Sequence, residues 1–227
     1  MTRIARIEIS GTGPNLLDPD VMGALERSIL DADADADPEI TGILLTGAGD
    51  SFCGGLDVAA IRAGADPVAF ASALVSLLRI FPTLSTPIAA AVNGDAVASG
   101  ASIVAVCDYA VATPTARLGT FEVSVGVWPM IAQVPIVHRI GARFAMENIG
   151  SGEPFTAERA REVGLVNAVR EPADVEPAVV AWLEAASRGG AAVAAGRRAF
   201  YELGELTYDD ALQSSLERFA AMFRDTA

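Results

Sequence analysis

Two segments of the chain share one design, in which an apolar strand runs into a glycine-rich turn that opens a helix. They are ILLTGAGDSFCGGLD (43–57) and IAAAVNGDAVASGAS (88–102). Missing side chains let a ligand approach the backbone, and the first N–H groups of a helix point outward without a partner. Two such N–H groups converging on one point would form an oxyanion hole, supported by the helix dipole. That arrangement suits an enolate or a tetrahedral oxyanion rather than a metal ion.

Glycine-rich turns also have other uses, as tight packing corners or as nucleotide-binding loops. The segment GAGDSFCGG lacks the Lys-Ser/Thr of a P-loop and does not match the G-x-G-x-x-G fingerprint. Spacing alone leaves the packing corner and the oxyanion hole both open.

Composition limits the class of protein. The 227 residues suit one domain, or one domain with a helical appendage. A 52% hydrophobic content suggests that some apolar surface is buried between subunits, and the net charge of −13 argues against nucleic acid. No apolar leader follows Met1 and no run reaches transmembrane length, so we expect a cytoplasmic protein without membrane contact.

Few residues of the chain suit metal or thiol chemistry. Cys53 and Cys107 are the two cysteines; we expect buried thiols, although a disulfide between them stays open. A single histidine, His138, makes histidine-based metal sites and Ser/His triads poor explanations. The carboxylates of DADADADP (31–38) lack the glycine and distal glutamate of an EF-hand, so we expect a solvated loop there.

Hydrophobic periodicity predicts alternating strands and helices in the first half of the chain and mainly helices in the second. Strands are expected at 3–10, 40–47, 86–94, the later part of 101–113, and 165–171. Helices are expected from Asp18 onward, after Gly55, and at 66–84, the start of 101–113, 132–150, 156–163, 176–187 and 191–224. This order predicts an α/β fold of stacked ββα units over 1–150 and a helical C-terminal or trimerisation region over 151–227.

Four segments together resemble the crotonase superfamily, the enoyl-CoA hydratase/isomerase family, over nearly the whole chain. They are GPNLLDPDVMGAL, GILLTGAGDSFCGGLD, PIAAAVNGDAVASGASIVAVCDYAVATPTARLGTFEVSVGVWP and GEPFTAERAREVGLVNAVRE. The resemblance implies a spiral core of ββα units, assembled as a homotrimer or hexamer. It also implies an acyl-CoA substrate, with coenzyme A as part of that substrate and no permanently bound cofactor or metal.

The resemblance places the thioester carbonyl between two backbone N–H groups, those of Leu56 and Ser99. The segment ASG stands where the family usually has three glycines, so the backbone at Ala98 must tolerate a Cβ.

Family hydratases use two glutamates to position a water and move its proton, and isomerases rely on one. Here the first glutamate position is occupied by Ser102 and the second by Glu122. The following loop carries Trp128 and Met130, which would line the substrate pocket with Ser102 and keep the pKa of Glu122 raised. The alternative is that these two side chains fill the core.

Coenzyme A would contact the first glycine-rich segment, through the backbone of Cys53 and Gly54 at its adenine and beside Leu56. Arg62 could meet a phosphate, although a solvated arginine is an equal alternative. Structural roles are expected for Asp57 as a helix cap and for the residues Asp108, Arg197 and Arg198. We expect His138 at the surface or an interface, and the resemblance implies a shortened C-terminal region.

The preferred reaction is the shift of a 3-enoyl-CoA to its 2-enoyl isomer. Hydration of an enoyl-CoA is the alternative, followed by decarboxylation or carbon–carbon chemistry on an acyl-CoA or acyl-carrier-protein thioester. A non-catalytic partner with the same fold ranks last.

Overall fold

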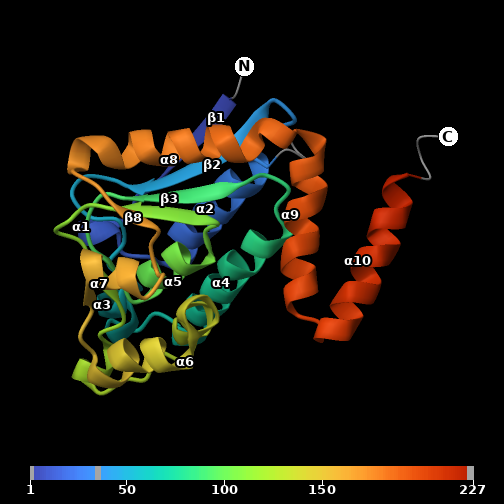
Figure 1. Ribbon diagram of the computed structural model, residues 1–227. Coiled ribbons are helices and arrows are strands. Elements are labelled where there is room, and N and C mark those ends of the chain that lie inside the picture. The colour runs from blue at the N-terminus through green and yellow to red at the C-terminus, as the bar shows by residue number, and fades with distance from the viewer. Residues whose placement is uncertain (1–2, 34–36, 224–227) are drawn as a thin grey trace.

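The computed structural model describes residues 3–33 and 37–223. Its main sheet has five parallel strands in the order β1-β2-β3-β5-β8, and a smaller sheet has three strands in the order β4-β6-β7. The strands are β1 (Arg3–Ile9), β2 (Ile40–Gly47), β3 (Ile88–Val92), β4 (Ala96–Val97), β5 (Tyr109–Ala112), β6 (Arg117–Gly119), β7 (Phe155–Thr156) and β8 (Ala168–Val169). The predicted α/β class is confirmed (Figure 1).

Helices cover both faces of the main sheet and extend beyond it on one side (Figure 1). The α-helices are α1 (Thr12–Asn15), α2 (Pro19–Asp31), α3 (Val58–Arg62), α4 (Pro67–Ile80), α5 (Ser99–Val106), α6 (Gln133–Ser151), α7 (Ala157–Glu162), α8 (Pro172–Ala186), α9 (Ala191–Gly204) and α10 (Tyr208–Met222). Short 3₁₀ turns are η1 (Phe81–Thr83), η2 (Glu122–Val125) and η3 (Ser187–Gly189).

Two consecutive ββα units build the centre of the molecule. The units β3-β4-α5 and β5-β6-α6 each place their first strand in the main sheet and their second in the small sheet. The isolated bridge between Cys53 and Ala96 brings the first glycine-rich turn to the edge of β4. These are the stacked units that the sequence predicts.

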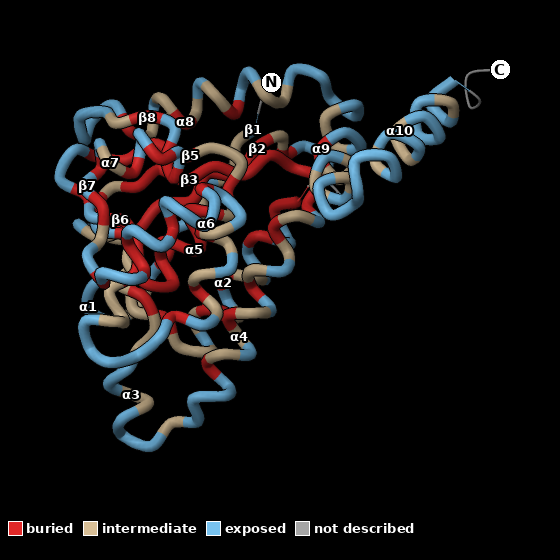
Figure 2. The backbone as a smooth tube through the Cα atoms, turned by 60° about the horizontal axis from the view of Figure 1, so that its bottom comes forward, coloured by how far each residue is buried: buried red, intermediate tan, exposed pale blue. Residues whose placement is uncertain are grey.

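The core lies on both faces of the central strands, as Figure 2 shows. All five residues of β3, IAAAV, are buried. Leu44, Ala89 and Val111 pack under α8, where they meet Val179 and Leu183. The opposite face forms the larger cluster with α2, α4, α5 and α6. A strand buried on both faces needs apolar residues throughout. The alanines of β3 meet this need and, being small, let helices approach from both sides.

The second half of the chain completes the same sheet. Strand β8 pairs with β5, and α8 packs across β2, β3 and β5. The sheet therefore continues past residue 150, where the sequence analysis divides the chain. That division stays a prediction.

The prediction of one continuous helix over 191–224 is wrong, because the structure has two helices there. Helix α9 ends at Gly204, and α10 begins after Thr207, whose side chain accepts the Asp210 N–H and caps the new helix. A capping threonine in this position stabilises a helix start. The two helices form a hairpin, with α10 standing away from the body of the molecule (Figure 1).

The predicted solvated loop over 31–38 is wrong at Asp33. This residue is buried, and its carboxylate accepts the N–H groups of Ser85 and Thr86. Residues 34–36 of that loop lie outside the described residues. Both cysteines are buried free thiols, as expected, so the disulfide alternative is wrong.

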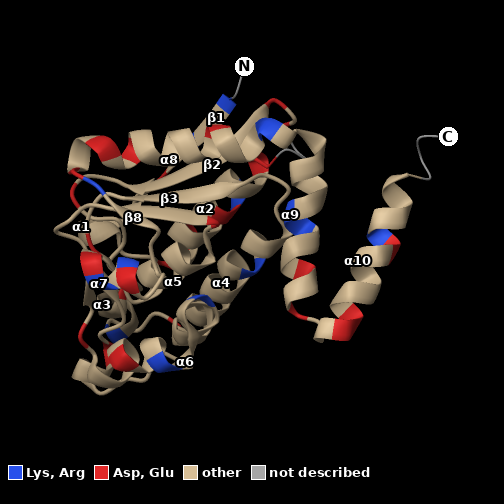
Figure 3. Cartoon of the chain, in the orientation of Figure 1, with Lys and Arg blue, Asp and Glu red and all other residues tan. Residues whose placement is uncertain are grey.

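Charged residues lie mainly on the outer helices and connecting loops, where acidic and basic residues are interspersed (Figure 3). Arg159 on α7 binds both Glu147 and Glu162 at this surface. In the described part of the chain, no helix is long and apolar enough to cross a bilayer.

Candidate active site

The two glycine-rich turns meet in the fold. A Cβ built on Gly55 would lie 2.6 Å from the Cβ of Ala98 and 3.6 Å from the Ser99 nitrogen. Gly55 has a φ of +92°, and such a close approach leaves no room for a side chain. The first turn therefore presents Leu56 beside the start of α5, which begins at Ser99.

Leu56 and Ser99 each have a backbone N–H that stays available. Leu56 lies opposite Leu17 in an isolated β-bridge, but the hydrogen bonds of that bridge are formed by the residues on either side of Leu56. The Gly55 carbonyl accepts the Leu17 N–H, and the Asp57 N–H donates to the Leu17 carbonyl. Ser99 is the first residue of α5, where no intrahelical acceptor exists. Within residues 3–33 and 37–223, neither N–H has a backbone acceptor. An oxyanion hole needs two such free donors on neighbouring turns, and the use of this pair in one stays a prediction.

Ala98 is the strained member of this site. It has φ +52° and ψ −121°, a conformation that favours glycine. Its N–H donates to Gly119 O at 2.9 Å, and its own carbonyl accepts the Ala101 N–H. These bonds hold the turn that aims the Ser99 N–H, so strain is retained at the point where the helix opens.

Asn15 supports the first turn and was not predicted from the sequence. It is buried with φ +58°, and its amide donates to the carbonyls of Ala48 and Ser51 at 2.9 and 2.7 Å. The preceding Pro14 accepts the Gly54 N–H at 2.8 Å. An asparagine directly after Gly-Pro was the available signal, because asparagine tolerates the left-handed region.

Glu122 begins η2, three residues after the Gly119 carbonyl that holds Ala98. It is half-buried, and its carboxylate accepts the Phe121 N–H at 2.9 Å. Burial raises the pKa of Glu122, while backbone hydrogen bonds partly oppose that shift. A carboxylate with a raised pKa is suited to accept and return a proton near neutrality.

Ser102 has a structural hydrogen bond inside the core. It is fully buried on α5, and its hydroxyl donates to the Ala132 carbonyl at 3.0 Å. This bond attaches α5 to the end of the loop that follows Glu122. The Ser102 side chain is fully buried, and its place in a substrate pocket stays a prediction.

Trp128 and Met130 lie at the surface of the described chain, 41% and 69% exposed, so the alternative that they fill the core is wrong. The Trp128 indole donates to Gln133 at 2.9 Å, which fixes the loop between Glu122 and α6. Val125 and Val127 are exposed beside them. Together Val125, Val127, Trp128 and Met130 form an apolar loop next to Glu122, and their contact with a substrate stays a prediction.

The residues expected to contact coenzyme A differ in whether their polar groups are already hydrogen-bonded within the chain. The Cys53 N–H donates to Asp95 O, its carbonyl accepts from Val97, and the Gly54 N–H donates to Pro14 O. Adenine contacts at Cys53 and Gly54 would use the remaining lone pairs of their carbonyls. Arg62 is exposed at the end of α3 and, among the described residues, forms no ion pair. Burial raises the pKa of the Cys53 thiol to about 12, so a thiolate is not formed near neutrality.

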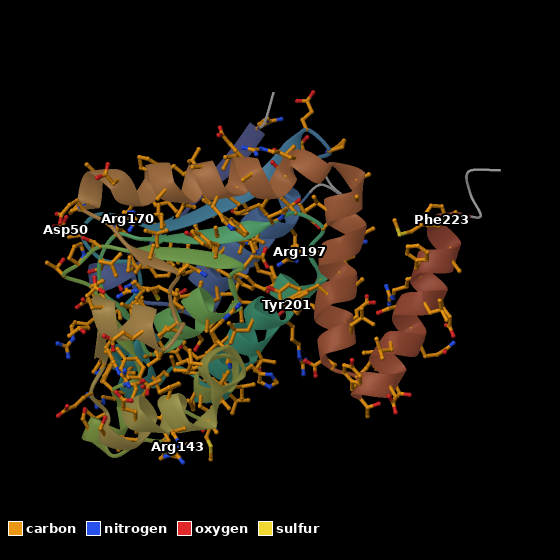
Figure 4. All side chains as sticks on the ribbon, viewed as in Figure 1. Asp50, Arg143, Arg170, Arg197, Tyr201 and Phe223 are labelled. Carbon is orange, nitrogen blue, oxygen red and sulfur yellow. The ribbon has the colours of Figure 1, made fainter. Side chains whose placement is uncertain are left out.

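Several polar residues have structural roles, as expected. Asp57 caps α3 through the Ala60 N–H. Arg197 on α9 forms a buried, bidentate pair with Asp108 at 2.8 and 3.0 Å. The Tyr201 hydroxyl donates to the same carboxylate, and Figure 4 shows both side chains pointing from α9 into the body of the molecule. Arg198 donates to the Thr83 carbonyl, and His138 lies at the surface.

Two surface hollows lie away from this constellation. One of about 920 Å³ lies between α9 and η1, and one of about 570 Å³ lies between α2 and α4. Neither is lined by Leu56, Ser99 or Glu122. Among the described residues, no group of three or more His, Cys, Asp or Glu side chains is placed to hold a metal ion.

Residues 3–227 match a family model described as enoyl-CoA hydratase/isomerase. A putative enoyl-CoA hydratase of Thermus thermophilus is 34% identical over 165 residues, 70% of this chain and 64% of that protein. The peroxisomal bifunctional enzyme of Danio rerio is 32% identical over 82% of this chain, but the match spans 25% of its length. The solved enoyl-CoA hydratase of Mycobacterium smegmatis superposes with a TM-score of 0.90 at 27% identity, covering 98% of this chain and 88% of that one.

Proposed function

Because the chain belongs to the enoyl-CoA hydratase/isomerase family, we propose that it is an enzyme that stabilises the enolate of an acyl-CoA. The thioester oxygen would accept the N–H groups of Leu56 and Ser99. Both donors are fixed before substrate binds, so they stabilise negative charge as it develops without reorganising.

The proposed reaction is isomerisation of a 3-enoyl-CoA to a 2-enoyl-CoA. Glu122 removes a proton from C2, and the charge spreads over the dienolate that the two N–H groups hold. The protonated Glu122 then returns the proton to C4, which leaves the double bond between C2 and C3. Atoms balance, because the carboxylate ends as it began and no water enters.

One observation carries this proposal over hydration. Ser102 occupies the position of a second carboxylate, and its hydroxyl donates a hydrogen bond to the Ala132 carbonyl. Hydration requires a water held and deprotonated opposite the site of protonation, and a single carboxylate beside an apolar loop is better suited to moving a proton between two carbons.

Hydration is the second candidate, and the names of relatives favour it. A Syntrophomonas wolfei protein named crotonyl-CoA hydratase is 28% identical over 90% of this chain and 83% of its own length. For this chain, hydration would require Glu122 to act on water without a partner at residue 102.

Substitution of Glu122→Gln tests the role of the carboxylate, because the amide keeps the shape and cannot take the proton. We expect kcat on a 3-enoyl-CoA to fall at least about 100-fold, with KM little changed. The matched control is Glu158→Gln, which alters a surface carboxylate paired with Arg161. Full activity in Glu122→Gln would contradict the assignment.

We also propose that the chain assembles as a homotrimer or hexamer. The supporting observation is the apolar surface that one chain leaves exposed, on the loop after Glu122 and on α10, where Leu212, Leu216 and Phe219 are 55%, 61% and 59% exposed. Clustered exposed apolar side chains are typical of surfaces that contact another protein chain.

A further inference from the structure

Asn148 is a fully buried amide on α6 that is bonded mainly to one residue of the neighbouring segment. Its Oδ1 accepts the Thr120 N–H at 2.7 Å and the Thr120 hydroxyl at 3.2 Å. Its Nδ2 donates to the carbonyls of Thr120 and Glu153, both at 2.8 Å. The side chain thus pairs with both backbone groups of Thr120, as a neighbouring strand would.

Thr120 stands between the two halves of the candidate site. On one side, the Gly119 carbonyl accepts the Ala98 N–H at 2.9 Å, and Ala98 directly precedes Ser99. On the other side, the Phe121 N–H donates to the Glu122 carboxylate at 2.9 Å. The oxyanion turn and the proposed base are therefore both attached to the segment that Asn148 holds.

The contact is also close. Gly119 has a φ of +134°, and a Cβ there would lie 2.5 Å from the Asn148 Oδ1. The glycine allows the amide to reach the backbone directly, so short hydrogen bonds join α6 to this segment.

We propose that Asn148 is a positioning residue that fixes the Glu122 carboxylate relative to the Ser99 N–H. This inference rests on the proposed function, since both groups must act on one substrate. Near-attack geometry is sensitive to displacements of about 1 Å, which cost as much as about 100-fold in rate. The amide acts through the backbone and does not touch the substrate.

The main test is Asn148→Leu, which keeps a similar volume and removes all four hydrogen bonds. We expect kcat on a 3-enoyl-CoA to fall about 10- to 100-fold with KM changed much less, because binding groups stay while their alignment is lost. Amide hydrogen exchange should rise in two separate peptides, one covering 96–101 and one covering 117–124.

The matched control is Val179→Ala, which opens a cavity under α8 on the other face of the sheet. It lowers the thermal midpoint but should leave kcat and the exchange of both peptides unchanged. If Asn148→Leu matches this control in kcat and in exchange, the amide is merely structural and the inference is overturned.

A second variant, Asn148→Asp, serves if the leucine variant does not fold. It keeps the acceptor toward the Thr120 N–H and places a carboxyl oxygen against the carbonyls of Thr120 and Glu153. Only the protonated form can donate to a carbonyl, so the ratio of its kcat to the wild-type kcat should rise as the pH falls. A ratio near one at every pH would overturn the inference.

The two proposals fail differently. Wild-type protein that converts no enoyl-CoA overturns the proposed function, and with it the catalytic role of Asn148. Active wild-type protein with unchanged kcat in both Asn148 variants overturns the positioning role alone.

Discussion

Ala98 carries a Cβ in a backbone conformation that is ordinarily left to glycine. Its φ of +52° puts a methyl group against Gly55 while its N–H and carbonyl are both bonded. The strain is held by the bond to Gly119, which also positions the Ser99 N–H. An alanine at this point indicates that the turn is fixed by its surroundings and not by its own preference.

Substitution of Ala98→Gly should therefore stabilise the protein, by about 1 kcal/mol, because the strain exceeds the added entropy of the unfolded chain. Chemical denaturation measures the change. The control is Ala101→Gly in the body of α5, which should destabilise by about 1 kcal/mol. A loss of stability in Ala98→Gly comparable to the control would show that Ala98 is not strained.

The raised pKa of Glu122 also predicts how stability depends on pH. Since burial makes the native state bind this proton more tightly than the unfolded state, the ionised carboxylate destabilises the fold above its native pKa. Substitution of Glu122→Gln should raise the thermal midpoint at neutral pH. That gain should shrink as the pH falls through the raised pKa toward the unfolded value. An equal gain at all pH values would contradict the assigned cause.

At this scale the sequence indicated part of the site. Leu56, Ser99 and Glu122 follow from the two turns and the family resemblance, and their catalytic roles stay predictions. Asn15 and Asn148 could not be found, because each acts through backbone groups that are distant in sequence, such as Ala48 and Thr120. Burial of Ser102 depends on its bond to Ala132, which the sequence does not reveal.

Helix α9 is held to the body of the molecule by one buried arginine. Arg197 binds Asp108 and also donates to the carbonyls of Leu84 and Phe81 at 2.6 and 2.8 Å. Burial and the Asp108 carboxylate raise the pKa of Tyr201, in the same cluster, to about 12, so the phenol stays protonated. The cluster joins α9, η1 and the end of α5.

Substitution of Arg197→Met should destabilise by about 3–5 kcal/mol, because it removes the only cation that pairs with the Asp108 carboxylate among the described residues. The carboxylate keeps the Tyr201 hydroxyl as a donor, but its charge is no longer balanced. The control is Arg218→Met, which removes an exposed pair with Glu202 and should cost at most about 1 kcal/mol. Denaturation of both variants makes the comparison. Equal effects would mean that the buried cluster does not anchor α9.

Long periodic elements were predicted best. Strands β1 and β2 and helices α2 and α4 match the expected segments closely, because their periodicity is set by a core on one or both sides. Helix α6 matches the expected segment in extent but is kinked at Gly141, which has φ +77° and ψ +157°. The two-residue strands β4 and β7 carry too few residues for a pattern. The break between α9 and α10 depends on the capping residue Thr207, which lies within the single helix expected over 191–224.

The whole molecule has a compact core with a helical hairpin beside it. Figure 4 shows α10 carrying side chains on a face that the rest of the chain does not cover. Leu212, Leu216 and Phe219 are exposed on α10 in the single chain, and their burial between subunits stays a prediction.

If the proposed trimer or hexamer forms through α10, Leu216→Asp together with Phe219→Asp should reduce it to monomers, because buried, unpaired carboxylates oppose association. Sedimentation velocity measures the mass. The control is Gln213→Asp, which adds charge to α10 at the polar residue that bonds Glu217. A wild-type protein that sediments as a monomer would contradict the proposed assembly.

The mass of the thioester product shows whether one carboxylate and two N–H groups move a proton without adding water. The wild-type protein is incubated separately with a 3-enoyl-CoA and a 2-enoyl-CoA, and the thioester products are weighed by mass spectrometry. We expect the 3-enoyl-CoA to become its 2-enoyl isomer at unchanged mass, in a reaction lost in Glu122→Gln. Rapid gain of one water by the 2-enoyl-CoA, with no isomerisation of the 3-enoyl-CoA, would contradict it.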